Sequence, residues 1–181
     1  MQKFERADFE VKEYVESENY GKFVLSPLER GFGTTIGNAL RRVLLSSLPG
    51  AAVFSIKVDG VYHEFTTIPG IREDVSMIIL QLKQLVMTIE DDDVYDLQIS
   101  AKGPCTITAG DIICPAQVEI LNKDLEIAHL EKDVTLEMEL KAKNGRGYVS
   151  ADINKQLNQG ASQGIGTVYT DSIYTPIEKV S

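Results

Sequence analysis

The stretch LERGFGTTIGNALRRVLLSSLPG, residues 28–50, decides the fold of this chain. Its first part combines glycines with hydroxyl side chains. Gly31 and Gly33 allow the backbone to turn through conformations closed to other residues. The hydroxyl of Thr34 or Thr35 can then accept an N–H group at the start of a helix. This part of the stretch predicts a glycine turn followed by a capped helix.

The predicted helix covers residues 35–48 and carries one apolar stripe. Its apolar side chains recur at helical spacing; they are Ile36, Ala39, Leu40, Val43 and Leu44. The pair Pro49-Gly50 is a helix stop. Arg41 and Arg42 lie about 100° apart around a helix, so at least one of them points away from the centre of the stripe.

Three interpretations of this helix compete. Glycines before a helix N-terminus, with Arg30 nearby, can bind phosphate. However, the spacing G-x-G-x-x-x-G is neither the dinucleotide nor the Walker pattern, which makes this interpretation the least favoured. The stripe could instead pack against a partner protein. From the residues alone, an ordinary core helix is favoured over that, because a helical apolar stripe usually faces a core.

Composition narrows the class of protein. The chain has 181 residues and a formal charge of -9, enough length for one large domain or two small ones. The acidic balance argues against nucleic-acid binding by the whole domain. The sequence shows no apolar run of membrane-spanning length and no secretory leader. Its two cysteines, Cys105 and Cys114, make no disulfide framework. We expect a cytoplasmic protein without membrane contact.

Charge is distributed unevenly along the chain. Residues 29–53 contain three arginines and one glutamate, a local charge of +2. Such a patch can meet an acidic partner surface or lie near nucleic acid, and a solvated helix face explains the same charge equally well. The acidic run at residues 90–93 is expected to be an exposed loop.

The remaining pattern predicts an α+β fold with mostly antiparallel sheets and two amphipathic helices. The second helix is expected over residues 73–87. Expected strands and turns are a strand over 53–58 with Phe54, Ile56 and Val58 on one face, a hairpin return over 61–65, a strand over 134–141, a turn over 144–147 and a final strand over 167–174. Residues 156–166 are expected to form a polar loop.

The sequence contains no clear catalytic constellation. His63 and His129 are isolated, and Cys105 and Cys114 lie nine apart, without the spacing of a zinc site. Neither cysteine is marked as an activated nucleophile. We therefore expect no catalytic residue, no metal and no cofactor.

Several ordered blocks resemble one known family. They are the 28–50 stretch, VDGVYHEF at 58–65, IPGIREDV at 68–75, Gly103-Pro104 with TAGDI at 108–112, GRGYV at 145–149 and DSIYTP at 171–176. Together they resemble the N-terminal assembly domain of the bacterial RNA polymerase α-subunit family, over essentially the whole chain. Family members continue beyond the position of Ser181 with a second dimerisation helix, so the chain resembles a fragment of them. Ser150 stands where the family commonly has proline.

The resemblance implies an architecture and a role. It implies a dimerisation subdomain formed by residues 1–50 and by the chain from 174 to 181, with residues 51–173 inserted as a second subdomain. The implied role is a non-catalytic subunit of a nucleotidyltransferase, which forms a homodimer and then recruits the β and β′ subunits. The absent C-terminal domain of the family is its DNA-binding part, so no DNA binding is expected here. The alternative is a free-standing nucleotide-binding domain that uses the Gly31–Gly37 turn.

The resemblance also implies roles for individual residues. The apolar stripe corresponds to the dimerisation helix, which reverses the preference for an ordinary core helix. Positions expected at β docking are Arg30, Gly33, Asn38, Arg41 and Arg42. Positions expected at β′ docking are Lys83, Thr170 and Asp171. For Arg42 docking is favoured over a solvated charge, because arginine suits interfacial ion pairs. For Lys83 docking and a solvated helix charge stay equally open.

Overall fold

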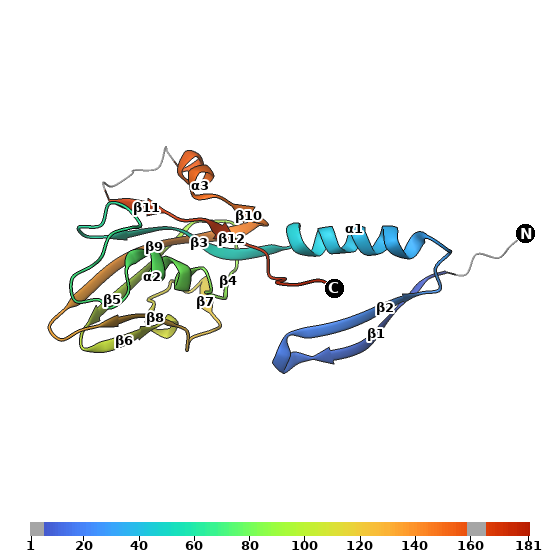
Figure 1. Ribbon diagram of the computed structural model, residues 1–181, viewed down its shortest axis with the longest axis horizontal. Coiled ribbons are helices and arrows are strands. Elements are labelled where there is room, and N and C mark those ends of the chain that lie inside the picture. Colours follow the sequence, from blue (N-terminus) through green and yellow to red (C-terminus); the bar gives the residue numbers. More distant parts are fainter. Residues whose placement is uncertain (1–5, 159–165) are drawn as a thin grey trace, which may run out of the picture. The chain divides into compact units, whose positions relative to one another are not determined.

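The computed structural model describes residues 6–158 and 166–181. They form two compact units (Figure 1): one runs to Val43 and includes Ser181, and the other runs from Leu44 to Val180. Most of the predicted loop over residues 156–166 lies outside the described residues. The subdomain boundaries inferred from the family resemblance remain a prediction.

The first unit begins with a β-hairpin. Strand β1 (Asp8–Val15), a single 3-10 turn η1 (Glu16–Glu18) and strand β2 (Tyr20–Ser26) form an antiparallel pair, in which Val15 lies opposite Tyr20. Asn19 permits the tight reversal because it adopts a left-handed conformation, with φ 49°. Helix α1 (Phe32–Ser46) follows and continues into the second unit. An isolated two-stranded hairpin is only marginally stable in water, so this unit needs further packing.

The second unit is built around a four-stranded antiparallel sheet with the order β11-β3-β9-β5. The sheet strands are β3 (Pro49–Val58), β5 (Tyr95–Lys102), β9 (Thr135–Arg146) and β11 (Thr167–Tyr169). Three antiparallel pairs flank it: β4 (Met87–Ile89) with β7 (Val118–Ile120), β6 (Cys105–Thr108) with β8 (Glu126–Leu130), and β10 (Tyr148–Val149) with β12 (Ser172–Ile173). The remaining elements are α2 (Val75–Leu82), the 3-10 turn η2 (Ala109–Asp111) and α3 (Ala151–Leu157). The predicted α+β class with mostly antiparallel sheets is confirmed.

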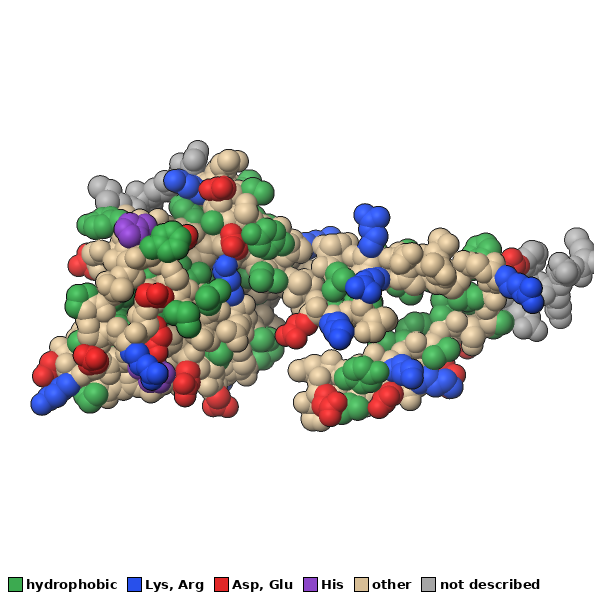
Figure 2. Space-filling view, in the orientation of Figure 1, with side chains coloured by type: hydrophobic (Ala, Val, Ile, Leu, Met, Phe, Trp, Pro, Cys, Tyr) green, Lys and Arg blue, Asp and Glu red, His purple; other side chains and the backbone are tan. Residues whose placement is uncertain are grey.

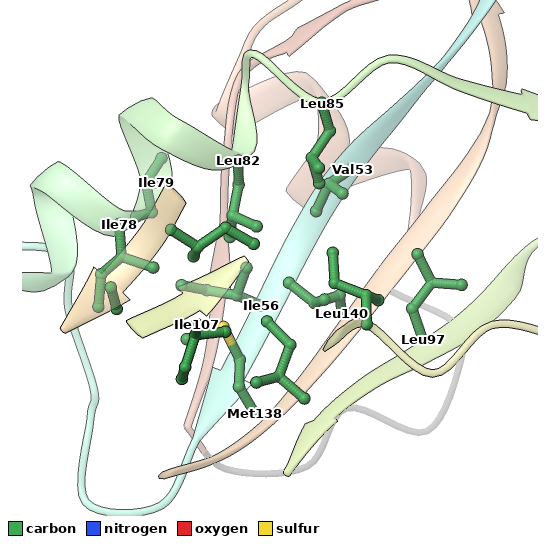
Figure 3. Close-up of a cluster of buried hydrophobic side chains, with 14 of the residues drawn as sticks. Val53, Ile56, Ile78, Ile79, Leu82, Leu85, Leu97, Ile107, Met138 and Leu140 are labelled. Atoms are coloured by element: carbon green, nitrogen blue, oxygen red, sulfur yellow. The ribbon is translucent and has the colours of Figure 1, made fainter. Parts of the chain in front are cut away.

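The core of this unit lies between α2 and the sheet. In Figure 3 the side chains of Ile78, Ile79 and Leu82 on α2 point toward those of Ile56 and Leu140 on neighbouring strands. All five are buried. Burying one such side chain contributes about 1.5–3 kcal/mol to the free energy of folding, so this cluster stabilises the second unit.

Helix α2 is shorter than predicted. Asp74 is its N-cap, and the Asp74 carboxylate accepts a hydrogen bond of 2.7 Å from the Met77 backbone N–H. The helix ends at Leu82, with Lys83 as its C-cap. The apolar residues from Leu85 onward continue the helical spacing by chance, since Met87 already belongs to β4 and pairs with β7.

A third helix, α3, was not expected from the sequence. The single buried residue of α3 is Asn154, which is polar. The helix therefore shows no apolar stripe that periodicity could detect. Ser150 occupies its N-cap position, Asp152 lies in its first turn and Lys155 in its last. These start and stop signals are the features that could have located it.

Three strand predictions were wrong in detail. A bulge between Val53 and Ser55 shifts the register of β3, so Val53 joins the core cluster with Ile56 and Val58, while Phe54 lies outside that cluster. Residues 61–65 form no strand, because the Val61 N–H closes a turn on the Val58 carbonyl and the chain then leaves the sheet.

The predicted turn at residues 144–147 is mostly strand. Strand β9 continues to Arg146, and the reversal is made by Gly147, with φ +62°. The predicted final strand over 167–174 is split in two, since β11 pairs with β3 and β12 pairs with β10. The split places Thr170 and Asp171 at the point where the chain passes between two sheets.

Candidate functional site

Helix α1 begins earlier than predicted. Its first residue is Phe32, so Thr34 and Thr35 lie inside the helix and neither is the N-cap. The turn before it is closed by a 3.2 Å hydrogen bond from the Phe32 N–H to the Glu29 carbonyl, and Gly31 has φ +90°. The expected role of Gly31 in the turn is therefore confirmed.

The other two glycines of the predicted loop are helical. Gly33 and Gly37 both lie within α1. A phosphate-binding loop over Gly31–Gly37 is therefore contradicted, and the nucleotide-binding alternative loses the feature on which it depended.

Two opposite faces of α1 carry different side chains. At 3.6 residues per turn, the predicted stripe of Ile36, Ala39, Leu40, Val43 and Leu44 occupies about 140° of the helix circumference. Phe32, which lies before the predicted helix, falls on the same stripe. On the same projection Asn38, Arg41 and Arg42 lie within about 100°, centred roughly opposite the stripe.

The predicted β-docking residues are thus only partly brought together. Asn38, Arg41 and Arg42 share one face of α1, whereas Arg30 lies in the turn that precedes the helix. Gly33 projects within the apolar stripe, between Leu40 and Leu44 in angle, and does not share the arginine face. The two arginines are the helix's only charged side chains.

The apolar stripe of α1 is exposed at Ala39, Leu40 and Val43 and half-buried at Ile36 and Leu44. No residue of α1 is buried, and Leu40 and Val43 are 46% and 50% exposed. In Figure 2 hydrophobic and basic side chains are both visible on this helix. The interpretation as an ordinary core helix does not hold within the described residues, because a core helix buries its stripe.

A second cluster brings the three predicted β′-docking residues together. The Lys83 ammonium at the end of α2 lies 3.1 Å from Asp171 Oδ2, although the two residues are 88 positions apart. Thr170 is buried beside them: its N–H donates to the Phe54 carbonyl at 3.0 Å. Lys83 is therefore not a solvated helix charge, and it forms a tertiary ion pair with the strand segment that leads into β12.

Asp171 is held from several sides. Its Oδ1 accepts a 2.9 Å hydrogen bond from the backbone N–H of Ala151, the first residue of α3. This backbone hydrogen bond lowers the pKa of Asp171; partial burial opposes it, and hydrogen bonds from Lys83 and from the Tyr148 hydroxyl act in the same lowering direction. The carboxylate therefore stays ionised at neutral pH and ties three segments together.

The sequence did not point to Asn154 and Ser172, which complete this cluster. The amide of Asn154 is fully buried, and its Nδ2 donates at 2.9 Å both to the Thr170 carbonyl and to Ser172 Oγ. Ser172 Oγ in turn donates to the Val53 carbonyl at 3.1 Å. One side chain of α3 therefore holds the 170–172 segment against β3.

Other groups that sequence analysis considered form structural contacts. His129 is not isolated: its N–H donates to Glu73 Oε2 at 2.7 Å, and its Nδ1 lies 2.7 Å from Glu73 Oε1. Partial burial opposes ionisation of Glu73, but these hydrogen bonds outweigh it and lower its pKa. Burial raises the pKa of the Cys114 thiol, and Cys105 and Cys114 are both free.

Over residues 6–158 and 166–181 no group of three or more His, Cys, Asp or Glu side chains could hold a metal ion. The second unit has a surface hollow of about 520 Å³ whose charged lining is Lys57, Asp59, Glu137 and Glu139. Lys57 already pairs with Glu139 at 3.4 Å, so the lining is acidic and would repel a phosphate. In the part of the chain that the structure describes, none of the helices has the length and apolar character needed to cross a membrane.

Comparison with known proteins agrees with this architecture. Residues 56–175 match the family described as the RNA polymerase Rpb3/RpoA insert domain. The chain is 52% identical over 181 residues to the DNA-directed RNA polymerase subunit alpha of Alkaliphilus metalliredigens (strain QYMF), covering all of this chain and 56% of that relative. It is 57% identical over 166 residues to the subunit of the same name from Oenococcus oeni (strain ATCC BAA-331 / PSU-1), covering 92% of this chain and 52% of that relative.

The chain spans about half the length of the curated relatives that it matches. The matched family segment includes the four-stranded sheet from Ile56 onward and the Lys83–Asp171 cluster. The chain therefore belongs to the RNA polymerase Rpb3/RpoA insert-domain family, and its relatives are bacterial DNA-directed RNA polymerase α subunits.

Proposed function

We propose that this chain is the assembly portion of an RNA polymerase α subunit, a non-catalytic scaffold that dimerises and recruits the β and β′ subunits. The observation that carries the proposal is the apolar stripe of α1, none of whose residues is buried. A stripe of large apolar side chains is costly to leave in water, so a partner surface is expected to cover it. The names of the relatives support the choice of polymerase as the assembly.

The proposal assigns two roles to the two faces of α1. The apolar stripe packs against a second copy of the protein. The opposite face, with Asn38, Arg41 and Arg42, remains available to β while the dimer is formed. Arg30, in the preceding turn, belongs to the same β-docking surface. Gly33 projects within the apolar stripe, so its β-docking role is proposed separately from that of the arginine face.

The dimerisation subdomain is proposed to comprise residues 1–50 and 174–181, with residues 51–173 inserted. A close approach inside the second unit supports this return of the chain. A Cβ atom on Gly50 would collide with the backbone carbonyl of Tyr174, so only glycine allows the two segments to lie so close. The ring of Tyr174 also packs over Gly145.

The β′-docking role is proposed for Lys83, Thr170 and Asp171. Its support is that the tertiary fold brings Lys83 against Asp171, which lies 88 positions away and directly follows Thr170. The catalytic residues for RNA synthesis are proposed to lie in other subunits of the assembly.

Light scattering over a concentration series, with a subunit pull-down, tests the proposal. Leu40→Asp places a charge in the stripe and should shift the protein toward monomer. Thr34→Asp adds the same charge on the other side of α1, in its first turn, and should leave self-association unchanged. The pull-down uses purified β, followed by β′. A wild-type protein that stays monomeric at all concentrations and captures neither subunit would contradict the proposal.

A further inference from the structure

The pair Asn144-Gly145 is the one Asn-Gly step in the sequence. An asparagine can lose its side-chain ammonia when the backbone nitrogen of the next residue attacks the side-chain carbonyl carbon. The attack forms a C–N bond and closes a five-membered succinimide, and water then opens this ring to aspartate or isoaspartate. Glycine favours the attack, because it has no Cβ atom to hinder the ring and reaches many backbone conformations. By sequence, Asn144 is therefore the most reactive asparagine of the chain.

In the folded chain the Asn144 amide is tied to another segment. Its Nδ2 donates hydrogen bonds to the backbone carbonyls of Ile89, at 3.0 Å, and of Asp91, at 2.6 Å. Both partners are acceptors, so only the NH₂ end of the carboxamide can face them. Ring closure would break both hydrogen bonds, because the side-chain carbon must move onto the Gly145 nitrogen.

The backbone around Asn144 is held as well. Asn144 lies opposite Ala51, and Gly145 lies opposite Gly50, in the β3–β9 ladder. The succinimide needs a rotation about ψ out of the range of an antiparallel strand, in which ψ is about +135°. A Cβ atom on Gly145 would lie 2.7 Å from the ring of Tyr174, so the backbone here is closely packed. Side chain and backbone therefore both oppose the reaction in the folded state.

The product of the reaction could not make the same contacts. An aspartate at position 144 would present acceptor oxygens to two backbone carbonyls, and it would add a negative charge beside the acidic run at 90–93. Asp92 and Arg146 line the same surface hollow as Asn144, which has a volume of about 330 Å³. Arg146 can offset the new charge, but it cannot replace the lost donor. Isoaspartate would also lengthen the backbone of β9 by one carbon and misalign its ladder with β3.

We propose that Asn144-Gly145 is a latent modification site, whose deamidation is suppressed by the fold and released when the 89–91 segment opens away from β9. The reaction consumes one water and releases one ammonia, so it needs no oxidant or reductant. The product cannot rebuild the two hydrogen bonds, so each event leaves the 89–91 segment without its hold on β9. The modification therefore marks those molecules that have opened at this place.

Peptide mapping by mass spectrometry tests the site. It measures deamidation at Asn144 in the folded chain and in the same chain unfolded in guanidinium chloride, at one pH and temperature. The unfolded chain should react at least about tenfold faster, because no hydrogen bonds have to open first. Asn122 is the internal control: the Cβ atom of Lys123 hinders its ring closure, so it should react more slowly than Asn144 in the unfolded chain.

Two results of this measurement would overturn the proposal. Equal rates at Asn144 in the folded and unfolded chains would show that the fold does not protect it. A faster reaction at Asn122 than at Asn144 in the unfolded chain would show that the Asn-Gly step is not the preferred site.

Tyr95→Phe tests whether the 89–91 segment controls the reaction in the folded protein. The Tyr95 hydroxyl donates to Asp91 Oδ2 at 2.6 Å, and the Asp91 carbonyl accepts the shorter hydrogen bond from Asn144. The variant should deamidate at Asn144 about threefold faster or more, the effect of losing one hydrogen bond. Tyr62→Phe is the matched control, because Tyr62 is an exposed tyrosine of the same unit. A wild-type rate in folded Tyr95→Phe would refute control by this segment.

Asn144→Asp reproduces one product directly. It should melt at a lower temperature than Asn144→Ala, which loses the same two hydrogen bonds without adding a charge. If Asn144→Asp does not fold, deamidated wild-type protein, separated by ion exchange after ageing, replaces it in the comparison. A deamidated or Asn144→Asp protein that melts with the wild type would show that the product rebuilds the site, and would overturn the lasting loss of contact.

Discussion

Replacing Asn154 by alanine tests how α3 is held to the second unit. The Asn154 amide donates two hydrogen bonds of 2.9 Å, to the Thr170 carbonyl and to Ser172 Oγ, in a fully buried position. Two such bonds contribute about 2 kcal/mol net. Leaving the Thr170 carbonyl buried without this donor costs about 1–3 kcal/mol more.

One effect of the Asn154→Ala substitution is stabilising. Asn154 Oδ1 has no hydrogen-bond partner among the described residues, so its removal relieves a buried polar atom. The expected net loss for Asn154→Ala is about 2–4 kcal/mol, which corresponds to roughly 5–15 °C in Tm for a chain of this size. The loss should be local, because Asn154 contacts the 170–172 segment.

Thermal and urea unfolding followed by circular dichroism measure this loss, and hydrogen exchange locates it. The amides of residues 168–173 should lose protection in Asn154→Ala. Gln156→Ala is the matched control, because Gln156 is an exposed residue of the same helix and alanine favours helix. If Asn154→Ala melts within about 1 °C of wild type and leaves 168–173 protected, the buried hydrogen bonds do not hold this segment.

Three further predictions concern other parts of the molecule. Arg42→Ala should weaken β recruitment by about 2–5 kcal/mol, with Arg41→Ala as the charge control. If the Arg42 variant captures β as well as the wild type does, the docking role of Arg42 is refuted. The pKa of Asp171 is lowered in the folded state, so its contribution to stability is present above pH about 4 and is lost as pH falls through the folded pKa. Accordingly, the Tm difference between wild type and Asp171→Asn should shrink between about pH 5 and pH 2, and a constant difference would refute this linkage. Gly50→Ala should destabilise the protein to urea by about 2 kcal/mol or more, because its Cβ meets the Tyr174 backbone, and a change below about 0.5 kcal/mol would show that the two segments can separate freely.

Local signals in the sequence were sufficient for some elements. The alternation of Leu136, Met138 and Leu140 located β9, because a strand that buries one face must repeat every two residues. The stripe of α1 was found for the analogous reason, although the helix starts three residues before the predicted position. The family resemblance then selected residues that the structure places on α1, in the turn before it and around Asp171.

Tertiary contacts decided the rest. The bulge that moves Phe54 out of the core cluster has no local signature, because it depends on how β3 pairs with β9. The last strand is divided because β11 and β12 find different partners. Helix α3 escaped detection because its one buried residue is polar.

The sequence by itself determined the fold class, the family and an amphipathic helix with arginines opposite its stripe. These depend on residue type and spacing along one segment. Only the tertiary structure decided that Lys83 meets Asp171 across 88 positions, and that no residue of α1 is buried among the described residues. Both depend on where distant segments come to lie, and an ion pair or an exposed surface of this kind leaves no periodic trace in the sequence.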